Sequence, residues 1–369
     1  MEPQQCGSCF SIQRTAENGT PAAVPPFHSA VREERKMPRK DQVSIKTIAE
    51  KTGLSTATVS RVINKKGGFT RETYERVQKA VQELDYVPNA MARGLRTRSV
   101  PLVGIIVPDI INEFFSRIVL RVQLALAARG YSVFICNTDE SAENEQTYLA
   151  TLQGMQISGL VCISGSDMTD EAWPNVPTVY IDRNPIRPAP RSTIIESDNL
   201  SGGWMAATEL LRRGCREIAL LGDERSLSTA LSRRNGFQHA LNDAGLVPEE
   251  SRIFSVAKVD EKNAYDAVSF ALRSGVTFDG LFCMTDWLAL GALKALENAH
   301  LRVPGQVRVV GFDDVRVASY SALPITTIRQ DTDEMSRLAV EELTRMMEGE
   351  PCRRPHWIVP VSLIRRETT

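Results

Sequence analysis

The residues best suited to chemistry in this chain are polar and aromatic side chains that follow apolar, β-rich runs. They comprise carboxylates, one amide, one guanidinium and two aromatic rings: Asp109, Phe114, Phe115, Asn137, Asp182, Arg233 and Asp286. Carboxylates and a planar guanidinium bond adjacent hydroxyls in pairs, while an aromatic ring covers the apolar face of a sugar. The pattern is therefore typical of a site that binds a polyol.

Each of these side chains also has a purely structural interpretation. Asp109 and Asp182 could cap the turns or helices that follow their strands, because Asp is favoured at such positions. Asp286 ends one apolar run and starts a helical one, so capping alone would explain it. Both phenylalanines could belong to a hydrophobic core, and Arg234 could replace its neighbour Arg233 as the inward-facing residue.

A second chemical pattern is the concentration of positive charge near the N-terminus. Between Pro38 and Arg98 there are thirteen Lys or Arg and six Asp or Glu, a net charge of +7, whereas the whole chain carries −1. A basic segment attached to an acidic remainder suits the binding of DNA phosphates by one end of the protein. An amphipathic helical bundle with a solvated basic face is the structural alternative.

The basic segment has the pattern of a helix-turn-helix. Apolar residues recur at helical spacing on both sides of Gly53, which permits a left-handed turn, and Ser55 can cap the second helix through its hydroxyl. Val59 and Val62 of that helix point inward, so small residues remain on the surface that would enter a major groove. The candidate DNA-contacting residues here are Thr47, Ser55, Thr56, Ala57, Thr58, Ser60, Arg61 and Asn64.

A third helix, capped by Thr70, closes this domain, and a short segment rich in arginine follows. Pro88 breaks the chain, and the next residues offer a brief helix that ends in Leu95 between arginines. A leucine so placed could act as a wedge in a minor groove, or it could be an ordinary packing residue. The candidate DNA-contacting residues of this part are Tyr86, Asn89, Ala92 and Leu95.

Beyond residue 99 the pattern changes to alternating strands and helices. The apolar, β-rich runs are residues 102–110, 131–138, 159–164, 176–182, 217–223, 252–257, 280–286 and 307–314, and helical segments separate them. This alternation predicts parallel strands with crossover helices, arranged as two doubly wound α/β sheets. Ligands of such sheets bind at the carboxyl ends of the strands, where the candidate site residues lie.

Five sequence motifs occur together and in order along the chain: IKTIAEKTGLSTATVSRVIN, YVPNAMARGLRT, VGIIVPDIINEFF, DGLFCMTDWLALGALKAL and VRVVGFDD. With these motifs the chain, from about Val43 to the C-terminus, strongly resembles the lactose-repressor and galactose-repressor family of bacterial transcription regulators. The resemblance implies that Thr56 and Ala57 head the recognition helix, that Arg61 belongs to its DNA-contacting surface, and that Ala92 and Leu95 lie on a hinge helix.

The resemblance also implies a periplasmic-binding-protein-like core of two subdomains with an effector site between them. Arg233 and Asp286 are then the anchor residues, and the chain crosses between subdomains near Glu196, Pro304 and Asp331. The expected organisation has a disordered leader, a helix-turn-helix domain, a hinge, and two discontinuous subdomains. In that order they span residues 1–40, 43–88, 89–98, 99–195 with 305–331, and 196–304 with 332–369.

Two positions depart from the family pattern. Glu113 stands where the family often has proline, which adds a negative charge and a hydrogen-bond acceptor near the mouth of the expected cleft. Val259 lies about where many relatives have an aromatic ring that stacks on the ligand. The effector therefore need not be a plain hexose.

The sequence shows little that indicates an enzyme. No G-x-G-x-x-G, G-x-x-x-x-G-K-[ST] or G-x-S-x-G motif is present, and the four histidines are dispersed without metal-ligand spacing. We expect no catalytic site, metal or cofactor. No apolar run approaches the roughly 20 residues that span a bilayer, and no export signal is recognisable, which argues against a solute-binding protein and for a cytoplasmic location.

The cysteines suggest thiols rather than disulfides. Cys136, Cys162 and Cys283 lie in apolar runs and are expected to be reduced core residues. Cys6 and Cys9 form a C-x-x-C in the leader, but no second pair or nearby histidine supports a metal site. Met37 stands where family members commonly begin, so the leader could reflect an upstream start codon.

Together these patterns predict a transcription regulator, expected to be a repressor, that acts as a homodimer on a pseudo-palindromic DNA operator. A two-fold dimer is needed because one helix-turn-helix reads only a few base pairs. A sugar or sugar derivative bound between the subdomains would control it. A purine, a phosphosugar or a protein co-effector is the alternative.

Overall fold

The computed structural model describes residues 44–64, 67–86, 101–163 and 175–369. The chain divides into two compact units, Met1–Pro88 and Asn89–Thr369. The boundary agrees with the expected end of the helix-turn-helix domain. The leader and the whole expected hinge, residues 89–98 with Asn89, Ala92 and Leu95, lie outside the described residues.

The described residues of the first unit form three helices. Its helices are α1 (Ile45–Thr52), α2 (Thr56–Ile63) and α3 (Arg71–Glu83). Gly53 ends α1 with φ 66°, and the side chains of Ser55 and Thr70 cap α2 and α3 as expected. Ile48, Val59, Val62 and Val77 are fully buried between the helices. The predicted helix-turn-helix is confirmed, and its fold follows from local capping and apolar spacing.

The second unit contains two six-stranded sheets. The first has the order β11-β5-β4-β3-β1-β2 and the second the order β12-β10-β9-β8-β6-β7. Their strands pair in parallel, except that β12 runs antiparallel to β10. The first sheet comprises β1 (Leu102–Val107), β2 (Ser132–Asn137), β3 (Gly159–Cys162), β4 (Thr178–Ile181), β5 (Ser192–Ser197) and β11 (His356–Val359). The second comprises β6 (Ile218–Asp223), β7 (Ile253–Val256), β8 (Gly280–Cys283), β9 (Arg308–Asp313), β10 (Thr326–Gln330) and β12 (Val361–Ile364).

Helices cover both faces of the first sheet. Ile105 of β1 belongs to a core that it shares with α5 (Glu113–Ala127) and α12 (Thr332–Met347). The next residue, Ile106, belongs to a separate core with α6 (Ala142–Gly154) on the opposite face. Because successive strand residues point to opposite faces, an unbroken apolar run requires a sheet that is covered on both sides.

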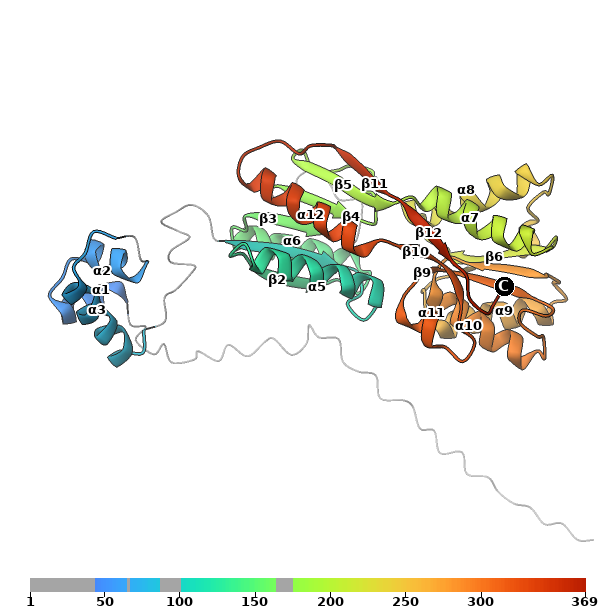
Figure 1. Cartoon of the computed structure of the whole chain (residues 1–369), viewed down its shortest axis with the longest axis horizontal. Coiled ribbons are helices and arrows are strands. Elements are labelled where there is room, and N and C mark those ends of the chain that lie inside the picture. The colour runs from blue at the N-terminus through green and yellow to red at the C-terminus, as the bar shows by residue number, and fades with distance from the viewer. Residues whose placement is uncertain (1–43, 65–66, 87–100, 164–174) are drawn as a thin grey trace, which may run out of the picture. The chain divides into compact units, whose positions relative to one another are not determined.

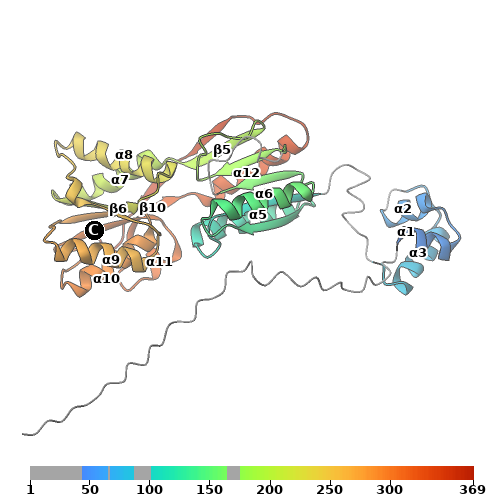
Figure 2. The ribbon, with the colours of Figure 1, turned by 180° about the vertical axis from the view of Figure 1, so that it is seen from behind.

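The second sheet is covered in the same way. Helices α7 (Asn199–Arg212) and α8 (Ser228–Asp243) lie on one face, and α9 (Glu261–Arg273) and α10 (Asp286–Asn298) lie on the other (Figures 1 and 2). A short helix, α11 (Arg316–Tyr320), and a 3-10 turn, Glu250–Arg252, complete this lobe. The prediction of two doubly wound α/β sheets is confirmed.

The expected division between the two subdomains is wrong in the last 65 residues of the chain, 305–369. Strands β9 and β10 pair with the second sheet, although residues 305–331 were assigned to the first subdomain. Helix α12 and β11 pack on the first sheet, although residues 332–369 were assigned to the second. Strand pairing between distant segments is non-local, so the hydrophobic period of a strand does not reveal which sheet it joins.

The chain crosses between the sheets three times. The crossings near Glu196 and Asp331 are confirmed, since β5 ends at Ser197 before α7 and β10 ends at Gln330 before α12. The third crossing is at Pro360, between β11 and β12, and not near Pro304 (Figure 1). Three parallel connections of this kind form a hinge between the two lobes.

The predicted chemistry of the cysteines is confirmed for the core. Cys136, Cys162 and Cys283 are buried free thiols, and burial raises the pKa of Cys136 to about 11. None of the helices in the described part of the chain has the length and apolar character that a membrane span needs.

Candidate functional site

Helix α2 presents the candidate DNA-contacting surface of the first unit. Thr56, Ala57 and Arg61 are exposed on it, while Ser60 and Asn64 are half-buried. The side-chain amide of Asn64 donates a hydrogen bond to the carbonyl oxygen of Ser60 at 2.7 Å. The front of the helix is therefore small and accessible, as entry into a major groove requires.

Other predicted DNA-contacting residues have local structural partners. The hydroxyl of Ser55 accepts a hydrogen bond from the Thr58 amide at 3.1 Å, and Thr47 forms a reciprocal capping box with Ser44. Tyr86 packs against the core of the domain. These residues shape the surface, and their contact with DNA remains a prediction.

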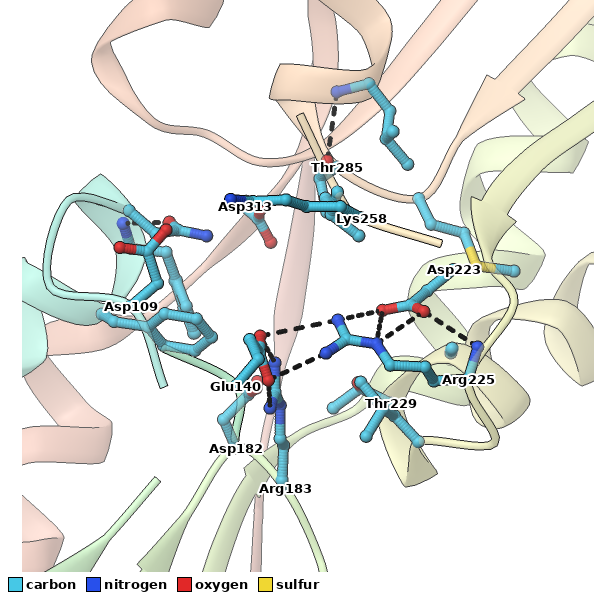
Figure 3. Close-up of a pocket in the computed structure, with 18 of the residues that line it drawn as sticks. Asp109, Glu140, Asp182, Arg183, Asp223, Arg225, Thr229, Lys258, Thr285 and Asp313 are labelled. Carbon is cyan, nitrogen blue, oxygen red and sulfur yellow. Dashed lines mark hydrogen bonds and ion pairs between the residues drawn. The ribbon is translucent and has the colours of Figure 1, made fainter. Parts of the chain in front are cut away.

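The candidate effector site is a cavity of about 370 Å³ between the two sheets of the second unit (Figure 3). Residues of both lobes line it, at the carboxyl ends of the parallel strands. Five of the seven predicted residues are among them: Asp109, Phe114, Phe115, Asp182 and Arg233. Val259 also lines the cavity, at the position where the sequence lacks an aromatic ring.

Two predicted residues support the cavity without lining it. The side-chain oxygen of Asn137 accepts a hydrogen bond from the Ile110 amide at 2.8 Å and so fixes the loop that carries Asp109. Asp286 is 0% exposed and accepts hydrogen bonds from the hydroxyl of Thr327 at 2.6 Å and the amide of Val315 at 2.9 Å. Neither residue is among those that line the cavity, because strand-end position alone does not distinguish lining from support, and their direct contact with an effector stays a prediction.

Arg233, on α8, is one of two buried arginines that line the cavity, the other being Arg183. Its Nε donates to Asn199 at 2.8 Å, its Nη1 donates to the Met284 carbonyl at 2.7 Å, and its guanidinium lies 3.7 Å from the centre of the Phe312 ring. Arg234 instead lies outside, half-exposed, and pairs with Glu250 at 3.5 Å. The choice of Arg233 over Arg234 as the inward residue is confirmed.

Helix α8 can hold Arg233 in this position because it packs unusually close to α7. A Cβ at Gly236 would lie 2.0 Å from the Leu200 carbonyl oxygen, and a Cβ at Gly203 would lie 2.1 Å from the Arg233 carbonyl oxygen. Only glycine permits such backbone contact.

Phe114 and Phe115 both line the cavity and belong to the core. They are 3% and 6% exposed and contact each other edge to face, with ring centres 5.4 Å apart. The guanidinium of Arg183 lies 5.4 Å from the centre of the Phe115 ring. The core role of these rings is therefore confirmed, and their contact with an effector stays a prediction that their place in the cavity lining allows.

Several charged residues of the cavity were not predicted from the sequence: Asp139, Glu140, Arg183, Asp223, Arg225, Lys258 and Asp313. Asp223 ends a predicted strand, Asp313 is the last residue but one of another, and Arg183 follows Asp182, so strand-end position was a usable signal for them. Glu140, Arg225 and Lys258 lie in loops, where no pattern distinguished them.

A network of ion pairs joins the two lobes at the cavity (Figure 3). Glu140 of the first lobe accepts hydrogen bonds from Arg183 at 2.7 and 2.8 Å and pairs with Arg225 of the second lobe at 2.9 Å. Arg225 is also bound to Asp223 at 2.5 Å. Burial acts to raise the pKa of Glu140, but the two arginines hold it below its usual value. The network therefore stabilises a closed arrangement of the lobes.

Glu113 provides a second bridge between the lobes. Its carboxylate accepts hydrogen bonds from Arg117 on its own helix at 2.7 Å and from the Arg316 amide of the other lobe at 2.9 Å. Arg117 in turn donates to the Asp314 carbonyl at 3.3 Å. Glu113 does not line the cavity, so its charge acts on the contact between the lobes.

Buried carboxyl groups dominate the electrostatics of the cavity. Burial raises the pKa of Asp182, an effect that the nearby charge of Arg233 partly offsets. Burial raises the pKa of Asp313 to about 7, again against the influence of Arg233, which lies 3.7 Å away. Within the described ranges, no group of three or more His, Cys, Asp or Glu is placed to hold a metal ion.

Comparison with known proteins agrees with this architecture. Residues 44–89 match the model described as "Bacterial regulatory proteins, lacI family", and residues 207–369 match "Periplasmic binding protein-like domain". The chain is 30% identical over 330 residues to the "HTH-type transcriptional regulator RegA" of Clostridium saccharobutylicum, which covers 88% of this chain and 99% of that protein.

Two solved structures extend the likeness to three dimensions. The lac repressor dimer bound to operator and the anti-inducer ONPF has 26% identity and a TM-score of 0.78, over 89% of this chain and 99% of that one. The complex of the transcriptional regulator CelR with cellobiose has 28% identity and a TM-score of 0.68, over 89% of this chain and 100% of that one.

Proposed function

Because this chain belongs to the lacI family of bacterial regulatory proteins, which bind DNA and control transcription, we propose that it is an effector-controlled repressor. It binds a pseudo-palindromic operator as a homodimer, through α2 of each subunit. A small molecule in the cavity between the sheets controls that binding. A DNA-binding regulator works where the chromosome is, in the cytoplasm.

The observation that carries this proposal is the cavity itself. Both lobes contribute charged groups to it, and the lobes are linked covalently by three crossings and non-covalently by the Glu140–Arg225 ion pair. A ligand that binds one arrangement of the lobes more tightly shifts the population towards it. The effector therefore changes the geometry from which the DNA-binding domains extend.

The lining of the cavity favours a carbohydrate or a carbohydrate derivative. Paired carboxylates and arginines suit adjacent hydroxyls, and the phenylalanines supply an apolar surface. The similarity to a regulator that was solved with cellobiose supports the same class of ligand. Ring stacking is reduced where Val259 replaces an aromatic side chain.

The DNA-binding part of the proposal depends on α2 and on positive charge. Thr56, Ala57 and Arg61 would face the bases, while the lysines and arginines around them neutralise phosphates. Two subunits set roughly 34–36 Å apart would read half-sites one helical turn apart.

The experiment that tests the proposal begins with selection of a preferred duplex from a random library, at a fixed salt concentration. Fluorescence anisotropy should give an affinity for that duplex at least about 1,000-fold above that for a scrambled duplex of equal composition. Equal affinity for both duplexes would contradict sequence-specific regulation.

The effector is then sought with a thermal-shift screen of sugars, sugar phosphates, sugar acids and nucleobases. A molecule that binds the folded state raises the melting temperature by mass action. Each hit is added to the operator-binding assay, and the proposal requires that at least one changes operator affinity. If only a nucleobase or a sugar phosphate binds, the effector belongs to that class and is not a carbohydrate, and the proposed regulatory mechanism is unchanged.

A further inference from the structure

The cavity between the lobes contains more carboxyl groups than cationic side chains. Its acidic residues are Asp109, Asp139, Glu140, Asp182, Asp223 and Asp313, and its basic residues are Arg183, Arg225, Arg233 and Lys258. Arg183 and Arg225 are already engaged by Glu140 and Asp223. The remaining acidic residues outnumber the remaining basic ones by four to two.

The least exposed of these carboxyl groups, Asp182, has one oxygen without a hydrogen-bond partner among the described residues. Asp182 is 4% exposed, and within the described residues its Oδ1 is buried without any hydrogen bond. A buried carboxylate oxygen without a donor is costly, and native proteins rarely retain one unless a ligand or water satisfies it. Asp182 therefore requires a hydrogen-bond donor from the contents of the cavity.

Arg233 does not supply that donor. Its two hydrogen bonds go to neutral groups, the Asn199 side chain and the Met284 carbonyl, and its closest approach to Asp313 is 3.7 Å. The hydrogen bond that Asp313 accepts comes from the side-chain amide of Gln330, at 2.7 Å. One guanidinium thus faces two buried carboxyl groups: it forms an ion pair with Asp313 at 3.7 Å, and within the described residues it donates a hydrogen bond to neither.

Asp182 and Asp313 are also held in unfavourable backbone conformations. Their φ angles are 71° and 107°, a region that residues with a side chain rarely adopt. Such strain persists where the surrounding structure requires a particular side-chain position, and it is concentrated at binding sites. The two residues come from opposite lobes, at the ends of β4 and β9, so each lobe presents one strained acid to the same cavity.

We propose that the effector carries a positively charged amino group, which the carboxyl groups of Asp182 and Asp313 bind together. The inference rests on the proposed effector site and narrows its ligand to amino sugars and related aminated polyols. An ammonium group has three donors and no acceptor, so it satisfies the Asp182 oxygen and offsets the excess negative charge. Hydrogen bonds between charged partners are roughly twice as strong as those between neutral ones.

Lys258 does not oppose this assignment. Its side chain is exposed at the cavity and forms no ion pair with any described residue, so solvent screens its charge. The hydroxyl groups of an amino sugar remain available to Asp109, Arg183 and Arg225, which also line the cavity. The amino group itself belongs at the buried end.

The test compares matched ligands on the full-length protein by isothermal titration calorimetry at pH 7. Each series contains an amino sugar, the parent sugar, the N-acetyl derivative and the uronic acid, with gluco, galacto and manno configurations. In at least one series the amino sugar should bind at least tenfold more tightly than its three counterparts. Equal or tighter binding of the parent, the N-acetyl derivative or the acid in every series would overturn the inference.

Variants of the two aspartates test where the amino group binds. Asp182→Asn and Asp313→Asn keep the side-chain shape and remove the charge, so each should reduce the amino-sugar preference to less than threefold. Asp266→Asn, which removes an exposed carboxylate on α9, should leave the preference unchanged. Melting temperature and operator affinity confirm that each variant is folded. A preference that persists in both cavity variants would place the amino group elsewhere and contradict the inference.

Failure of this inference is distinguishable from failure of the proposed function. If a neutral or acidic sugar binds best and changes operator affinity, the regulatory proposal stands and the amino-group assignment is wrong. If no compound binds and operator affinity never changes, both are wrong.

Discussion

Arg233 and Arg234 are adjacent in the chain and have opposite surroundings. Arg233 is 6% exposed and lies between Asn199, Met284 and the Phe312 ring, whereas Arg234 pairs with Glu250 at the surface. This contrast gives the site a matched pair of residues in which only one should act on the effector.

Arg233→Ala should abolish the response to effector while operator binding is retained. The loss of hydrogen bonds to a charged group should weaken effector binding by roughly 1.5–3 kcal/mol. Operator affinity, measured by fluorescence anisotropy with and without effector, reports the response. Arg234→Ala is the control and should respond normally, and a normal response of Arg233→Ala would remove this residue from the site.

Asp313 should make folding stability depend on pH. Its pKa is about 7 in the folded protein against an ordinary value of 3.8, because burial and Asp182 outweigh Arg233 and the Gln330 hydrogen bond. The folded chain therefore retains a proton that the unfolded chain loses, and stability falls as pH rises from about 4 to 7.

The measurement is the free energy of unfolding in urea at pH 5, 6, 7 and 8. Titration of Asp313 should lower the free energy of unfolding by up to roughly 1.4 kcal/mol for each pH unit of increase below pH 7. Asp313→Asn should show a shallower decline than the unmodified protein. Parallel pH profiles for the two proteins would show that Asp313 titrates normally.

The arrangement of helices α7 and α8 determines where Arg233 lies. Gly203 and Gly236 bring the two helices into backbone contact, and the anchor residue projects from α8 into the cavity. The position of the site therefore depends on two residues that have no side chain of their own.

Gly236→Ala should destabilise the protein and weaken effector binding together. The new methyl group would meet the Leu200 carbonyl oxygen at 2.0 Å, so α8 must shift, at a cost of about 1–3 kcal/mol. Gly154→Ala in α6 is the matched control, since its methyl group would meet nothing within 4 Å, and it should be neutral or stabilising. Thermal unfolding checks both, and equal melting temperatures would refute the close-packing argument.

At the scale of the whole molecule, the two lobes are joined by three chain crossings and by few polar bridges. Glu140 binds Arg225, Glu113 binds the Arg316 amide, and the Asn184 amide donates to Ser228 at 2.9 Å. These contacts form only when the lobes are close, so they set how readily the cavity opens.

Glu113→Gln should favour opening of the cavity. The bridge to the Arg316 amide would lose its charge, and a loss of about 1 kcal/mol in the closed form should speed effector release roughly fivefold. Stopped-flow measurement of the effector dissociation rate checks this. Glu297→Gln, which removes an exposed pair with Lys294, should release effector at the normal rate. An unchanged rate for Glu113→Gln would contradict the bridging role.

Leu95→Ala tests the link between body and DNA in the part of the chain outside the described residues. If Leu95 is a wedge in the minor groove, its loss should weaken operator binding by about tenfold or more and nonspecific binding much less. Anisotropy titrations with operator and scrambled duplexes provide the comparison. Equal losses on both duplexes would refute the wedge.

Local sequence determined much of this protein. Apolar spacing, Gly53 and Ser55 were enough to predict the helix-turn-helix, and the alternation of strand and helix patterns was enough to predict two α/β sheets. Both predictions succeed because a partly buried helix or strand shows its hydrophobic period within a short stretch of sequence. Strand-end positions also located five residues of the cavity, since parallel strands all present their carboxyl ends at one edge.

Only the tertiary structure decided which distant segments meet. It moved the third crossing to Pro360, made Asn137 and Asp286 supporting residues, and joined Glu140 to Arg225 across the lobes. These facts depend on pairing and packing between residues far apart in sequence. Local periodicity does not report such contacts. The ion pair between the lobes and the excess of carboxyl groups in the cavity are therefore seen only in the folded molecule.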